Sequence, residues 1–107
     1  MANANQFTTK FETVSGATTP NNSITTSPGT ANTEFTLSLT GNVKQVFLRC
    51  QEQSNLQIAF TASQSGTNYW TIRKGSALIL DNLNVNSPNI YVQADQASVN
   101  IELMYWT

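Results

Sequence analysis

The chain of 107 residues lacks histidine, has a single cysteine, and has charged side chains at only 10% of its positions. Without histidine it lacks the commonest general base and the commonest zinc ligand. Cys50 has no second cysteine with which to form an intrachain disulfide and no histidine to activate it, so it is predicted to be a core or interface hydrophobe. We therefore expect a non-enzymatic protein with no catalytic residue, no metal and no cofactor.

Charge is also too scarce to create an electrostatic binding surface. Five basic residues oppose six acidic ones, which leaves a formal charge of −1. Nucleic acid and anionic membranes require a basic surface, so neither is expected as a partner. No apolar run approaches the ~20 residues of a membrane span. Met1 is followed by Ala-Asn-Ala-Asn-Gln instead of a secretion signal, and the lone thiol fits synthesis in a reducing cytosol.

Two-carboxylate hydrolysis requires a defined separation between two acidic side chains. The acidic residues are instead scattered along the chain: Glu12, Glu34, Glu52, Asp81, Asp95 and Glu102. Their spacing gives no support to a hydrolase.

Most of the polar residues are uncharged: Ser, Thr, Asn and Gln make up more than two fifths of the chain. Threonine suits strands, whereas Asn and Ser suit turns. Alternating apolar residues predict about eight short strands, at residues 6–14, 35–40, 43–51, 56–61, 69–73, 77–80, 90–94 and 99–105. Gly41-Asn42 predicts a hairpin between the second and third of these strands.

This pattern predicts one all-β domain over residues 1–107, an antiparallel β-sandwich of jelly-roll-like form. Periodicity does not fix the strand order, so an immunoglobulin-like order is the alternative. Residues 1–5 are predicted to be a polar arm and residues 15–33 a long polar loop. Such a loop is either a solvated surface segment or a contact arm that orders on a partner.

Aromatic residues give the clearest candidates for an interface. In the last predicted strand, Met104 and Trp106 alternate with the apolar face and so point outward. Either a loop, another sheet or another subunit must cover Trp106. Because Trp, Tyr and Met are favoured at interfaces, Tyr91, Met104 and Trp106 are the candidates for a subunit interface.

The last third of the chain resembles the small β-sandwich structural proteins of bacteriophage virions, most of all head decoration or cement proteins. The resemblance rests on WTIRKGSALILD at residues 70–81, IYVQAD at residues 90–95 and SVNIELMYW at residues 98–106. The family usually has proline before the glycine of the first segment, where this chain has Arg73-Lys74-Gly75.

This resemblance implies a virion protein that is made in the host cytoplasm and located on the capsid surface. It would bind the major capsid protein, often as a homotrimer, and stabilise the assembled capsid by bridging capsomers. The candidate capsid contacts lie in the predicted arm and loop: Asn3, Asn5, Gln6, Asn21, Asn22 and Ile24.

The alternative function is a carbohydrate-binding module or a protein associated with the phage tail or fibre. Sandwiches of this kind present aromatic platforms and amide side chains to sugars. The candidate glycan platform is Asn68, Tyr69 and Trp70.

Overall fold

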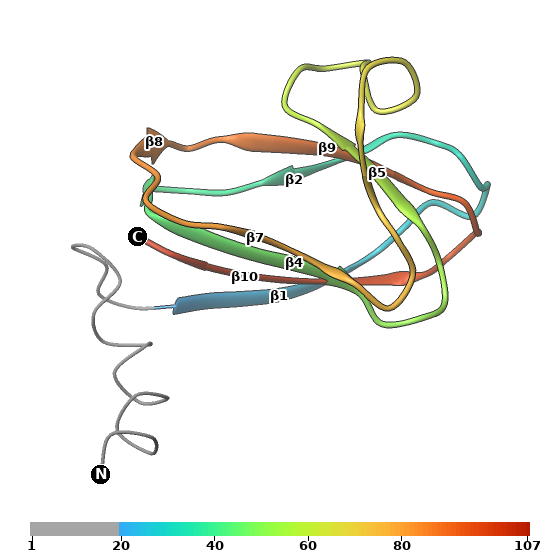
Figure 1. The fold of residues 1–107 in the computed structure, drawn as a ribbon, viewed down its shortest axis with the longest axis horizontal. Coiled ribbons are helices and arrows are strands. Elements are labelled where there is room, and N and C mark those ends of the chain that lie inside the picture. The colour runs from blue at the N-terminus through green and yellow to red at the C-terminus, as the bar shows by residue number, and fades with distance from the viewer. Residues whose placement is uncertain (1–19) are drawn as a thin grey trace, which may run out of the picture.

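The computed structural model describes residues 20–107, which form ten strands (Figure 1). They are β1 (Pro20–Thr26), β2 (Phe35–Ser38), β3 (Asn42–Val43), β4 (Gln45–Cys50), β5 (Leu56–Ala59), β6 (Trp70–Ile72), β7 (Ala77–Leu80), β8 (Val85–Asn86), β9 (Asn89–Ala94) and β10 (Asn100–Trp106). Among these residues no helix is long and apolar enough to cross a membrane.

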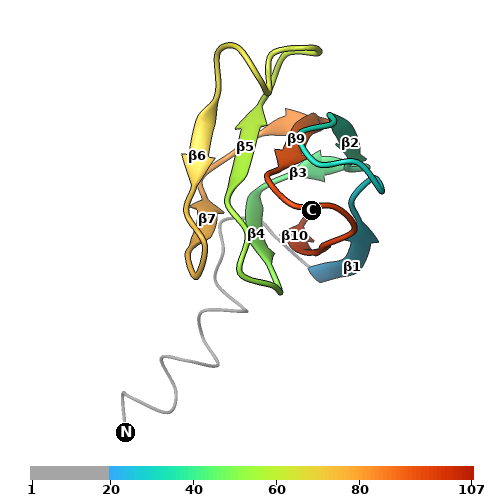
Figure 2. The same ribbon diagram turned by 90° about the vertical axis from the view of Figure 1, so that its right-hand side faces the viewer.

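Eight of the strands form two antiparallel sheets that face each other (Figures 1 and 2). Sheet A has the order β1-β10-β4-β7, and sheet B has the order β2-β9-β5-β6. The short strands β3 and β8 form a separate pair. In chain order, the first of the eight longer strands pairs with the last, the second with the seventh, the third with the sixth and the fourth with the fifth. This order is that of a jelly roll, so the predicted fold class is confirmed.

The core lies between the sheets and is built by alternation, because every second residue of a strand points to the same side. Each strand region predicted from residue 35 onward contains an observed strand. The apolar side chains buried together in this core are Leu37, Leu39, Val43, Val46, Leu48, Leu56, Ile58, Ile72, Ile90, Val92, Ala94, Val99, Ile101, Leu103 and Tyr105. Both sheets contribute to this set.

The predicted hairpin at Gly41-Asn42 is wrong. β2 belongs to sheet B and β4 to sheet A, so the chain between them crosses from one sheet to the other. Gly41 has a φ of 84°, a conformation that glycine adopts without steric cost. Turn residues showed where the chain changes direction, but the strand partners depend on contacts made much later in the chain.

The polar loop predicted at residues 15–33 is wrong for residues 20–26, which form the edge strand β1. The register with β10 turns Asn21, Ser23 and Thr25 toward the inner side and Ile24 outward. The usual pattern of apolar residues inside is therefore inverted, and backbone pairing with β10 holds the strand. The predicted arm at residues 1–5 and strand at residues 6–14 lie outside the described residues.

Matched isoleucines can test this assignment of faces. Ile101 is fully buried, whereas Ile24, on the neighbouring strand, is 62% exposed. Ile101→Ala should lower the free energy of unfolding by about 2–5 kcal/mol, because it removes buried methyl groups and leaves a cavity. Ile24→Ala should change it by less than about 0.5 kcal/mol. Urea denaturation would measure both, and equal losses would contradict the assignment.

Candidate binding surfaces

The outer side of sheet A carries an apolar groove of about 650 Å³. Its walls and floor come from all four strands of the sheet: Asn22, Ser23, Ile24, Phe47, Leu48, Arg49, Ala77, Glu102, Leu103 and Met104. The register places Phe47 beside Met104 and Asn22 on the other side of Met104. Ile79 lies next to Phe47 and is 57% exposed. An exposed apolar surface of this kind is typical of an interaction site.

The charged part of the groove is neutralised within the sheet. Arg49 on β4 donates a hydrogen bond from Nε to Oε1 of its cross-strand neighbour Glu102. The other carboxylate oxygen of Glu102 accepts a hydrogen bond from Gln51 Nε2 at 2.8 Å. The bond from Arg49, followed by that from Gln51, lowers the pKa of Glu102. This exposed ion pair borders the apolar surface without giving it a net charge.

Trp106 points to the outer side, as predicted, yet the ring is only 1% exposed. It packs edge-on against Phe47, with ring centroids 5.3 Å apart and an interplanar angle of 61°. Met104 is half-buried on the same side, while Tyr91 lies on β9 in sheet B. The three predicted interface residues therefore do not form one surface, and Trp106 helps to build the face on which Met104 lies.

The predicted capsid contacts also do not form one surface. Asn22 and Ile24 line the groove beside Met104, whereas Asn21 belongs to the inner side of β1. Asn3, Asn5 and Gln6 lie outside the described residues. The groove thus combines residues that the sequence assigned to two different surfaces, because β1 and β10 are distant in the chain but adjacent in sheet A.

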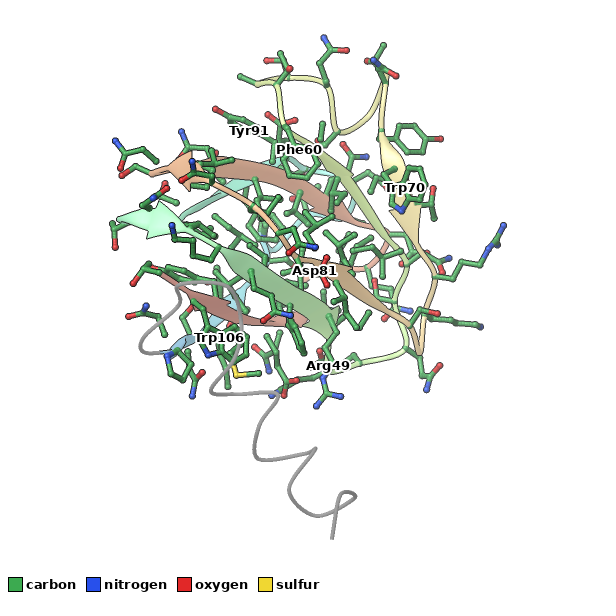
Figure 3. The ribbon with its side chains drawn as sticks, turned by 60° about the vertical axis from the view of Figure 1, so that its left-hand side comes forward. Arg49, Phe60, Trp70, Asp81, Tyr91 and Trp106 are labelled. Carbon is green, nitrogen blue, oxygen red and sulfur yellow. The ribbon has the colours of Figure 1, made fainter. Side chains whose placement is uncertain are left out.

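A second apolar surface surrounds the connection between β5 and β6 (Figure 3). Phe60, Tyr69 and Trp70 are all exposed there, with Trp70 at 67%. Of the predicted glycan platform, Asn68, Tyr69 and Trp70 are exposed and consecutive, and Trp70 begins the edge strand β6. Sequence periodicity missed Phe60 because it placed that residue on the buried face of a strand, whereas β5 ends at Ala59.

Glu34 holds this connection in place. Its Oε2 accepts a hydrogen bond from Ser63 N at 2.9 Å, and its Oε1 accepts one from Ser65 N at 3.1 Å. Ser65 is completely buried. At Gly66, an added Cβ would lie 3.0 Å from Gln93 Oε1, so the loop packs closely against β9. The Ser65 hydroxyl and then the Ser63 amide lower the pKa of Glu34.

Asp95 ties the start of β5 to the end of β9. It accepts hydrogen bonds from Ser54 Oγ at 2.7 Å, Asn55 N at 3.1 Å and Asn55 Nδ2 at 3.0 Å. The Ser54 hydroxyl is the main cause of the lowered pKa of Asp95. Such carboxylates remain ionised at neutral pH and act as hydrogen-bond acceptors that fix loops.

Cys50 packs partly buried against the core, with Sγ 3.8 Å from Glu52 Oε1. Burial raises the pKa of this thiol, so the uncharged form is favoured. Glu52 itself accepts a hydrogen bond from Asn100 N at 2.7 Å. Within residues 20–107, His, Cys, Asp and Glu form no group of three that could hold a metal ion.

Comparison with protein-family models, curated proteins and solved structures finds no match to this chain.

The lowered pKa of Asp95 gives a prediction for acid stability. A carboxyl group whose folded pKa lies below its unfolded value stabilises the fold above the unfolded pKa, and this contribution is lost as the pH falls through the folded pKa. For Asp95 the loss should begin below about pH 4. Asp95→Asn should be less stable at pH 7 and should lose less stability on acidification, as measured by urea denaturation from pH 7 to pH 2.5. An acid dependence as steep as that of the original chain would contradict this role.

Proposed function

We propose that this protein is a non-enzymatic structural protein of a bacteriophage virion, which decorates the assembled capsid and stabilises it by bridging capsomers. Its partner is the major capsid protein, and its place is the capsid surface after synthesis in the host cytoplasm. The likeness of residues 70–106 to head decoration proteins suggests this class.

The observation that carries the proposal is the presence of two exposed apolar surfaces on opposite layers of one sandwich. The groove belongs to the outer side of sheet A, and the aromatic residues surround a loop that extends from sheet B. A bridging protein requires two such surfaces. Both are held in place, the groove by a continuous sheet and the loop by Glu34.

Bridging strengthens binding through effective concentration. Once one surface of the protein is bound to a capsomer, the second surface meets the neighbouring capsomer as a local partner, so two weak contacts act as one strong contact. A lattice that offers both contacts only after expansion is stabilised by mass action. We assign Ile24, Asn22 and Met104 in the groove to one capsid contact, and Phe60 and Trp70 to the other.

Sedimentation with heads of the phage that encodes the chain tests this function. The full-length protein should pellet with expanded heads at a saturating stoichiometry and should raise their heat resistance. Ile24→Lys should weaken binding at least about tenfold, because it places a charge in the apolar contact.

Val85→Lys is the matched control, since Val85 is an exposed apolar residue of β8, outside both four-stranded sheets, and does not line the groove. This variant should bind as the original chain does. Failure of the unaltered protein to pellet with heads would contradict the proposed function. Equal binding by both variants would contradict only the assignment of the groove.

The exposed aromatic residues also favour the second candidate, a glycan-binding role within a phage tail or fibre. Trp70 and Tyr69 stand out from the surface beside Asn68, whose side chain supplies amide groups for sugar hydroxyls. Aromatic faces and amides are the groups that suit a sugar ring.

Tryptophan fluorescence separates the two candidates, because Trp70 is exposed whereas Trp106 is buried. For a glycan-binding protein, titration with polysaccharide from the host cell surface should shift the emission of the original chain, and Trp70→Phe should abolish most of that shift. The decoration function predicts no saturable shift with either protein. Thermal unfolding followed by circular dichroism would verify that Trp70→Phe remains folded.

A further inference from the structure

The edge strand β7 (Ala77–Leu80) is the least protected edge of the sandwich. Within residues 20–107 it pairs with β4 on one side only and ends sheet A. Its sequence, Ala-Leu-Ile-Leu, contains neither a charge nor proline. Natural edge strands usually carry such features, because unpaired backbone N–H and C=O groups invite pairing with another chain.

The other edges are better protected. β1 begins with proline and is otherwise polar except for Ile24. The exposed side chains of β2, Thr36 and Ser38, are polar, and β6 has only three residues. In Figure 2, β6 and β7 lie one above the other along the same side of the molecule. Each of these two strands has an exposed apolar side chain, Trp70 on β6 and Ile79 on β7. A partner that pairs with β7 would therefore cover apolar surface as well as backbone.

The charges at the two ends of β7 point to the occupant of this edge. Arg73 and Lys74 precede the strand, Asp81 follows it, and all three are exposed. No described hydrogen bond or ion pair engages the side chains of Lys74 and Asp81. An antiparallel copy of the same strand would bring the basic end of each chain to the acidic end of the other.

We propose that β7 pairs with β7 of a second copy around a two-fold axis through Leu78, joining the two copies of sheet A into one continuous sheet. In this register Ile79 of each copy lies opposite Ala77 of the other, so a large exposed side chain meets a small one. Asp81 lies opposite Gly75, beside Lys74. The two-fold axis makes each of these contacts occur twice.

This inference adds a partner to the proposed function and is tested without capsids, so the two can fail separately. The pairing predicts a dimer, whereas the resemblance to decoration proteins implies a trimer. Light scattering coupled to size-exclusion chromatography, over a dilution series of the full chain, should give twice the mass of the 11.7 kDa chain at high concentration. A monomer throughout, or a stable trimer, would overturn the pairing.

Variants with altered charge locate the contact. Ile79→Lys should weaken the dimer at least about tenfold, because it brings a charge into the apolar pairing. Val85→Lys, at an exposed apolar residue of β8, is the matched control and should leave the mass unchanged. Equal effects of the two variants would overturn the assignment to β7.

Charge exchange then tests the antiparallel register. Lys74→Asp and Asp81→Lys should each weaken the dimer about threefold, because each places like charges together. The double variant should recover the original dissociation constant, since the attraction is restored with its sign exchanged. If the double variant instead shows the sum of the two single losses of affinity, the register is overturned. Circular dichroism of each variant would establish that the sandwich remains folded.

Discussion

The structure depends on the position of β10 between β1 and β4 in sheet A. This last strand closes the jelly roll, because it pairs with the first described strand and with one from the middle of the chain. Its inner side chains, Ile101, Leu103 and Tyr105, are buried in the core. The Tyr105 hydroxyl also accepts a hydrogen bond from Thr40 N at 3.3 Å, which links β10 to the segment leaving sheet B.

The outer side of the same strand creates the groove. Met104 and Glu102 lie at its centre, flanked by residues of β1 and β4. Because the inner and outer side chains of β10 alternate, core packing fixes the strand that carries the binding surface. Three of the few charged side chains have structural roles. Glu34, Asp95 and Glu102 each accept hydrogen bonds that hold a loop in place or link neighbouring strands. None of these three carboxylates is therefore left without a hydrogen-bond partner beside an apolar surface.

The aromatic loop belongs to sheet B, whereas the groove and the edge of β7 both belong to sheet A and share Ala77. In the proposed function, the groove and the loop contact capsomers, whereas the β7 edge joins two copies of the chain. A dimer would double the number of capsid contacts in one rigid unit and so increase avidity. Stability of the lattice would then arise from many modest contacts in place of one strong site.

Sequence alone determined the strands with ordinary alternation, such as 90–94 and 99–105, because burial of one face leaves a period of two. It also determined the all-β class and the outward direction of Trp106. Tertiary structure decided which strands pair, that residues 20–26 join a sheet despite their polar inner face, and that Trp106 is buried and packs against Phe47. It also decided that Ile24 and Met104 share a groove while Tyr91 belongs to the other sheet. The physical reason is that alternation records only which side of a strand is buried, whereas pairing and surfaces depend on contacts between residues far apart in the chain.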